Sequence, residues 1–149
     1  MSEFFFEKPP NFHVAVEVST VFMEYEKKLL LLLLRSKHCT APESWAIPGG
    51  KLQGNETPLE GLMREIWEEL LLQPNSADLS YIGVLYVHHS LAKYKLHLFR
   101  WQLASNPHIV INYKEHQNFL WQPITQFSDL PLLEGQLEAF NFVYGKFQE

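Results

Sequence analysis

The segment from Gly50 to Glu69 constrains the fold more than any other part of the chain, because it predicts an amphipathic helix that follows a glycine-rich loop. Thr57 can cap the helix N-terminus, Pro58 suits the first turn, and Glu60 can complete a Thr-x-x-Glu capping box. At about 100° per residue the apolar side chains form one narrow stripe, consisting of Leu59, Leu62, Met63, Ile66 and Leu70. We therefore expect this helix to pack its apolar face against a sheet.

The opposite face of the helix carries Glu65, Glu68 and Glu69, which are neighbours at i,i+3 and i,i+4 spacing. Arg64 is the one adjacent cation, and Gly61 on the same side predicts clearance for a bound ligand. An ordinary solvated face would intersperse lysines and would not need the preceding Pro-Gly-Gly loop. Carboxylates are the hard oxygen ligands that Mg²⁺ and Mn²⁺ use, so the pattern predicts a divalent-metal site for phosphate chemistry.

The remaining elements give an α+β order of strands, helix, strands, helix. The strands His13–Met23 and Lys28–Arg35 should form a hairpin. In the strand Lys95–Leu103 the apolar residues shift from one face to the other, which suggests a bulge. The C-terminal helix should bury a stripe from Leu133 to Phe147 that includes Leu137, Phe140 and Tyr144. The predicted strands are His13–Met23, Lys28–Arg35, Trp45–Ile47, Ser80–His88, Lys95–Leu103 and Phe119–Pro123.

The composition favours one globular domain over residues 1–149, with 46% hydrophobic residues. The single cysteine, Cys39, rules out an internal disulfide, and the absence of a secretory leader makes a cytoplasmic protein the default. The run Leu29–Leu34 is too short to span a membrane and predicts a buried strand. A net charge of −5 makes nucleic acid an unlikely partner; a monomer and a homodimer both remain open.

The spacing Gly50-x₅-Glu56-x₇-Arg64-Glu65-Ile66-x-Glu68-Glu69 resembles the signature box of the Nudix hydrolases. One position departs from the family pattern, because Leu71 stands where the family usually has the glycine that ends the helix. We therefore expect Pro74 to act as a later stop. The resemblance extends to Trp45–Gly50, to Leu31–Arg35, and to Lys114-Glu115-His116 with the following Trp121, which resembles the distal acidic loop of the family.

This resemblance implies a Nudix-type α/β/α sandwich around a mixed sheet, and a pyrophosphohydrolase that acts on a nucleoside diphosphate linked to another moiety. It implies that Glu65, Glu68 and Glu69 hold Mg²⁺, or Mn²⁺, with help from the Gly50 backbone carbonyl and from Glu115. Either Glu65 or Glu115 would be the general base. Arg64 would orient the carboxylates by pairing with Glu56 and a neighbouring glutamate.

Arg35 and Lys51 are candidates for substrate phosphate contacts, and Trp121, with Phe119 and Trp45, for stacking on a base. An aromatic residue in a strand is, however, more often part of the core. The histidines at 88, 89 and 116 lack a zinc-ligand spacing, so we expect them to be structural or exposed. Cys39 has no paired base in the sequence, which argues against a nucleophile.

The leading substrate is a small nucleotide, a nucleoside triphosphate, cleaved to monophosphate and pyrophosphate. ADP-ribose, a nucleotide sugar or a dinucleoside polyphosphate would use the same acids. A catalytically silent nucleotide-binding module is a further alternative, although such a module would be expected to have lost box carboxylates. Action on an RNA 5′ end is disfavoured by the acidic net charge.

Overall fold

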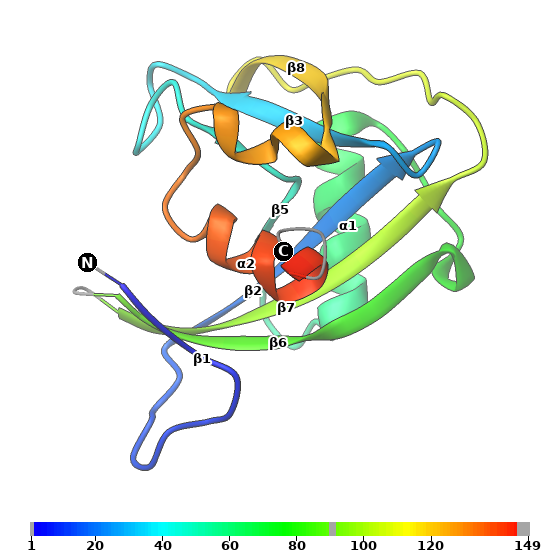
Figure 1. The fold of residues 1–149 in the computed structure, drawn as a ribbon. Coiled ribbons are helices and arrows are strands. Elements are labelled where there is room, and N and C mark those ends of the chain that lie inside the picture. The colour runs from blue at the N-terminus through cyan, green and yellow to red at the C-terminus, as the bar shows by residue number, and fades with distance from the viewer. Residues whose placement is uncertain (1, 90–91, 146–149) are drawn as a thin grey trace.

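The computed structural model describes residues 2–89 and 92–145, which form a mixed eight-stranded sheet with helices on both faces (Figure 1). The strands are β1 (Glu3–Phe5), β2 (Val16–Tyr25), β3 (Leu29–Arg35), β4 (Trp45–Ala46), β5 (Gly49–Lys51), β6 (Leu79–His89), β7 (Ala92–Leu103) and β8 (His116–Pro123). The helices are α1 (Pro58–Leu70) and α2 (Gln136–Tyr144), with short 3₁₀ turns at Ser76–Asp78 and Ile124–Asp129. The predicted α+β sandwich around a mixed sheet is confirmed.

The sheet has the order β1-β6-β7-β2-β3-β4, and its central pair, β2 and β7, is parallel. β2 and β3 pair only near their shared turn, at Glu24↔Leu30 and Tyr25↔Leu29. Further along β2 the partner is β5, with Ser19 opposite Gly50, while β3 pairs instead with β4 and β8. The glycine loop, which contains Gly49 and Gly50, is therefore part of the sheet along the portion of β2 that does not pair with β3.

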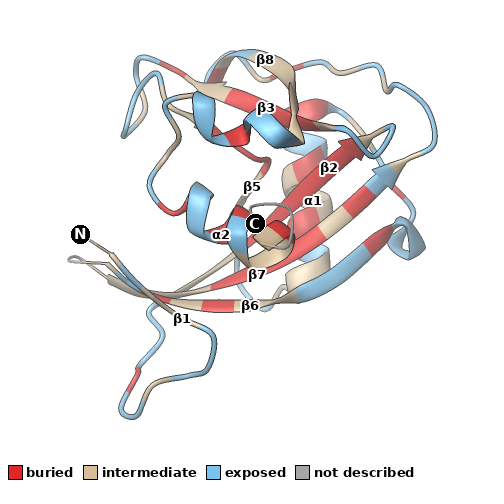
Figure 2. Ribbon diagram, in the orientation of Figure 1, coloured by how far each residue is buried: buried red, intermediate tan, exposed pale blue. Residues whose placement is uncertain are grey.

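The core has two layers, one on each face of the sheet, and Figure 2 shows the buried residues concentrated on the central strands. On β7, Leu96 and Leu98 pack on the α2 side, whereas Phe99 and Trp101 pack on the α1 side. The apolar shift in this segment therefore reflects burial of both faces, and the predicted bulge in β7 was wrong. The irregularity lies in β6, where the register shifts between Tyr81 and Gly83.

Helix α1 begins as predicted, with both hydrogen bonds of the Thr57–Glu60 capping box present. It ends earlier than expected, because Leu71 itself adopts the left-handed conformation (φ 53°, ψ 43°) and its N–H donates to the Trp67 carbonyl. The expected stop at Pro74 was wrong. A single left-handed residue can close a helix without glycine, at a cost of about 1–2 kcal/mol.

Helix α2 buries Ala139, Phe140 and Tyr144 against the sheet. The predicted stripe is correct only in part, because Leu133 precedes the helix and Leu137 is 38% exposed; Phe147 lies outside the described residues. The helix starts only after Gly135, which turns the chain with φ of +95°. Neither helix of the described chain has the length and apolar character needed to cross a membrane.

Candidate active site

The loop between β7 and β8 is tied to the C-terminal end of α1. The N–H of Asn112 donates to the Glu69 carbonyl, and that of Val110 to the Leu70 carbonyl, both at 3.2 Å. These bonds satisfy carbonyls that a helix end leaves without partners. They also bring the start of β8 to the helix, so that ligand atoms of Glu69, Glu115 and His116 lie within 4.8 Å of one another.

Glu69 is fully buried at the centre of this cluster. Its Oε1 accepts a hydrogen bond from the Gly49 N–H at 2.8 Å, which links the acid directly to the glycine loop. Burial raises the pKa of Glu69 well above its usual range, and the nearby carboxylates of Glu65 and Glu115 raise it further. A buried carboxylate with acidic neighbours gains strongly from a cation, so the donors present fit a divalent metal.

His116, which we expected to be structural or exposed, is buried and lies in this cluster. Its ring is buried, and Nε2 lies 3.5 Å from Glu69 Oε2. Burial and the Arg35 charge lower the pKa of His116 to about 4, so this contact is not an ion pair at neutral pH. His88 and His89 lie elsewhere, beside Glu3 and Glu134.

Glu65 lies directly against the glycine loop, and this contact explains why position 50 is a glycine. A Cβ on Gly50 would lie 2.4 Å from both Cδ and Oε1 of Glu65. Burial raises the pKa of Glu65, although the Arg64 guanidinium opposes the shift. The backbone of Gly50 and the carboxylate of Glu65 are therefore held side by side at the mouth of the acidic cluster.

Arg64 binds several groups of the site at once. Its guanidinium donates two hydrogen bonds to Glu56, at 2.7 and 3.0 Å, and one each to Glu65 and Glu68, at 3.0 and 3.1 Å. A further bond, to the Lys51 carbonyl, joins helix and loop. The hydrogen bonds from Arg64 lower the pKa of Glu56. Arg64 thus positions carboxylates, while Glu68 remains half-exposed on the outer side.

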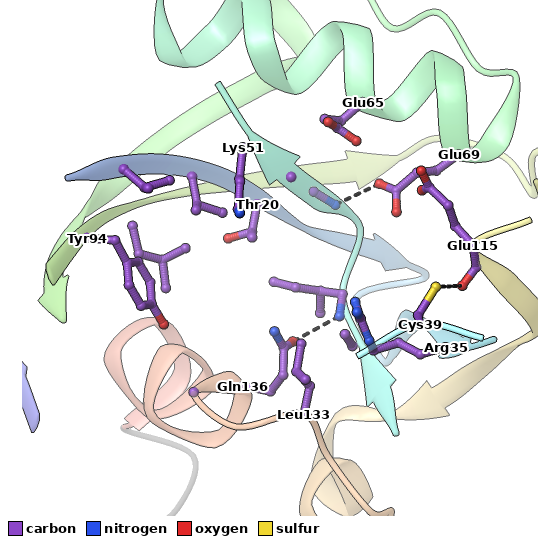
Figure 3. Close-up of a pocket in the computed structure, with 18 of the residues that line it drawn as sticks. Thr20, Arg35, Cys39, Lys51, Glu65, Glu69, Tyr94, Glu115, Leu133 and Gln136 are labelled. Atoms are coloured by element: carbon purple, nitrogen blue, oxygen red, sulfur yellow. Dashed lines mark hydrogen bonds between the residues drawn. The ribbon is translucent and has the colours of Figure 1, made fainter. Parts of the chain in front are cut away.

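A cavity of about 640 Å³ connects the acidic cluster with an apolar region on the α2 side of the sheet (Figure 3). Arg35 and Lys51, the two candidates for phosphate contacts, both line it. The Arg35 guanidinium is held by the carbonyl and hydroxyl of Thr40. The residues at the apolar end are Val16, Val18, Ala92, Tyr94, Leu96 and Leu133.

Gln136 and Tyr94 were not identified from the sequence as site residues, yet both line the cavity (Figure 3). Gln136 Oε1 accepts the Ile47 N–H at 2.9 Å, which fixes the orientation of the amide. Tyr94 projects from β7 on the same face as Leu96. No local pattern separates such a tyrosine from a core aromatic; the sheet must be assembled first.

Two predicted features lie outside this cavity. Trp121 does not line it: the ring packs beside Tyr25, with centroids 5.8 Å apart, in the core layer beneath α1. Its position on β8 directs it to the other face of the sheet. Gly61 provides no ligand clearance either, because Leu52 Cδ2 occupies the space where its Cβ would lie, at 2.2 Å. Phe119 and Trp45 also pack against the core.

The sequence matches the NUDIX domain over residues 12–143. Comparison with curated proteins finds no match.

Several solved structures share the fold. A MutT protein from Methanosarcina mazei Go1 has a TM-score of 0.72 at 22% identity, covering 90% of this chain and 95% of that one. A C. elegans Ap4A hydrolase has a TM-score of 0.71 at 16% identity (90% and 98%). The NUDIX domain of Shewanella oneidensis NrtR, complexed with ADP ribose, has a TM-score of 0.74 at 15% identity (95% and 94%). Because the domain match spans most of the sequence, the chain belongs to the Nudix hydrolase family.

Proposed function

We propose that this Nudix hydrolase cleaves a nucleoside triphosphate to the monophosphate and pyrophosphate in a Mg²⁺-dependent reaction. The observation that carries the proposal is the continuity of one cavity from the acidic cluster to an apolar end lined by Tyr94. A nucleotide has the matching polarity, with phosphates at one end and a flat base at the other. The cavity volume of about 640 Å³ lies in the range typical of small-molecule sites.

The residues that would hold the metal are Glu65, Glu69 and Glu115, with the Gly50 carbonyl, and Glu68 by its position in the box. A bound divalent cation supplies neutralisation of phosphate charge and acidification of a water molecule. Arg64 keeps Glu65 and Glu68 from rotating away, because one nitrogen, Nη1, contacts both carboxylates. Replacing Arg64 should therefore loosen the site without removing a ligand.

Of the two candidate bases, we favour Glu65. Burial raises its pKa, which makes its ionised form a stronger base near neutral pH. Arg64 holds Oε1 at 3.0 Å and so fixes the carboxylate in one orientation. Glu115, with its ligand atom near those of Glu69 and His116, is better placed to hold the metal.

Arg35 and Lys51 would bind the phosphates, since both line the cavity that contains Glu65 and Glu69. The apolar end, bounded by Tyr94 and the fixed amide of Gln136, would take the base. The structural neighbours include an Ap4A hydrolase and a domain complexed with ADP ribose. Dinucleoside polyphosphates and ADP-ribose are therefore required comparison substrates.

The test is hydrolysis with Mg²⁺ of canonical and oxidised nucleoside triphosphates, ADP-ribose, nucleotide sugars, dinucleoside polyphosphates and triphosphorylated RNA. We expect the highest kcat/KM with a triphosphate and, in H₂¹⁸O, label in pyrophosphate, as attack at the β-phosphorus requires. Glu65→Gln should lower kcat by about 10²–10⁴-fold, whereas Glu138→Gln, an exposed change on α2, should not. Preferred turnover of another class would refute the triphosphate assignment, and no turnover at all would indicate a silent module.

A further inference from the structure

We propose that His116 is a nitrogen ligand of the metal site, beside Glu69 and Glu115, and that this ligand gives the site a preference for divalent transition ions over Mg²⁺. The inference rests on the proposed metal-binding role of the two glutamates. It adds a donor of a different chemical class to an otherwise all-oxygen site.

The first support is geometric. The three ligand atoms lie within 4.8 Å of one another, and ligands bound at 2.0–2.2 Å to one ion lie within about 4.4 Å of each other. Small side-chain rotations would therefore suffice. The backbone bond from Asn112 to the Glu69 carbonyl fixes the loop against the helix, so the cluster is held together before any ion arrives.

The second support is a buried polar atom without a hydrogen-bond partner. His116 is 5% exposed, and its Nδ1 is the one buried side-chain nitrogen or oxygen in the described chain that lacks a partner. Nε2, on the other side of the ring, lies 3.5 Å from Glu69 Oε2. A buried polar group normally has its hydrogen bonds satisfied, so this ring lacks the pattern of a purely structural histidine.

His97 provides the comparison within the same protein. It is buried to the same degree, at 4% exposed, but both of its ring nitrogens are bonded. Nδ1 lies 2.9 Å from the Tyr81 hydroxyl, and Nε2 lies 2.8 Å from Glu17. Both ring nitrogens of buried His97 therefore have hydrogen-bond partners, whereas buried His116 has an unpartnered Nδ1 and lies beside two carboxylates.

The chemical class of the ligand atoms determines which metal ion binds most tightly. Mg²⁺ binds oxygen ligands, whereas imidazole suits Zn²⁺, Fe²⁺ and Ni²⁺, and affinities rise from Mn²⁺ through Fe²⁺ and Co²⁺. An imidazole beside two carboxylates should therefore bind Co²⁺ or Zn²⁺ more tightly than an all-oxygen site of the same charge. Mg²⁺ should gain little from the nitrogen.

The test measures metal binding to the full chain without nucleotide. Co²⁺ affinity is determined by visible absorption and Mg²⁺ affinity by calorimetry, for wild type, His116→Gln and the control His108→Gln, an exposed histidine in the β7–β8 loop. We expect His116→Gln to weaken Co²⁺ at least about tenfold and to change Mg²⁺ affinity much less. His108→Gln should match wild type. An unchanged Co²⁺ affinity, or equal losses for both ions, would overturn the proposal.

A second measurement does not require the variant to fold. Pulsed EPR of wild type with one equivalent of Mn²⁺ should show coupling to a directly bound nitrogen, which should change on ¹⁵N labelling of histidine. A spectrum without nitrogen coupling would also overturn the proposal. The histidine proposal and the proposed function fail in different ways. Mg²⁺-dependent triphosphate hydrolysis without nitrogen coordination would refute only the histidine ligand. Nitrogen coordination without turnover would refute only the substrate assignment.

Discussion

The contact between Gly50 and Glu65 gives a sharp test of the site, because one added methyl group should move the carboxylate that we propose as the general base. In Gly50→Ala the new Cβ would lie 2.4 Å from Cδ and Oε1 of Glu65, against 3.4 Å for ordinary contact. The carboxylate must therefore retreat by about 1 Å. It is the far end of a side chain, so the backbone need not move.

The expected effect follows from that displacement. A misplacement of about 1 Å in a catalytic constellation costs on the order of 10²-fold in rate, or about 2.7 kcal/mol of transition-state stabilisation. Moving Glu65 also disturbs its bond to Arg64, which is 3.0 Å long in the wild-type protein. The fold should lose less than about 1 kcal/mol, because only a half-buried side-chain end is displaced.

The assay combines kcat/KM on the preferred nucleotide with urea unfolding. Gly145→Ala is the matched control, because its Cβ meets no described atom within 4 Å. Gly49→Ala is the opposite case: its Cβ would lie 2.3 Å from the Ser19 carbonyl oxygen, so we expect a loss of stability instead. Wild-type activity in Gly50→Ala, with the fold intact, would refute the role assigned to Glu65.

Three further predictions concern stability. Leu71→Gly should stabilise the protein by about 0.5–1 kcal/mol and raise Tm by roughly 2–4 °C, because the left-handed residue is 46% exposed and loses little packing; a lower Tm would contradict this. Tyr144→Phe should cost about 1.5–3 kcal/mol in urea unfolding with unchanged turnover, because its hydroxyl donates to the buried Glu24 carboxylate. In metal-free protein the raised pKa of Glu69 means that stability falls as pH rises above about 4.5. Glu69→Gln should flatten that part of the pH profile and abolish stabilisation by added metal, and an unchanged slope would count against the assignment.

Local pattern was sufficient for the elements whose cause is local. The start of α1 is encoded by Pro58 in the first turn and by Thr57 and Glu60, which form the capping box. The end of the helix was predicted incorrectly, because the left-handed residue that closes a helix is usually, but not always, glycine. Here Leu71 adopts that conformation at a modest cost in free energy. The β7 pattern was misread for a related reason, since a strand buried on both faces does not alternate.

Aromatic and histidine roles depended on assembly. Trp121 and Tyr94 are both strand aromatics, yet they lie on different faces of the sheet, one in the α1-side core and one in the cavity. The segment around His116 resembles the distal acidic loop of the family, but no metal-ligand spacing in the sequence separates this histidine from His88 or His89. The backbone bonds from Val110 and Asn112 to the end of α1, together with the pairing of His116 opposite Arg35 in the sheet, bring it to Glu69.

The sequence by itself determined the family, the acidic helix and the type of chemistry, because the box carboxylates follow one another at fixed helical spacing. The tertiary structure decided which of them meet: it separates the half-exposed Glu68 from the buried Glu69, and adds Glu115 and His116 from a distant loop. The physical reason is the range of the forces involved. Helix periodicity and capping act over a few residues, whereas a binding cluster forms where sheet pairing and burial bring distant segments into contact.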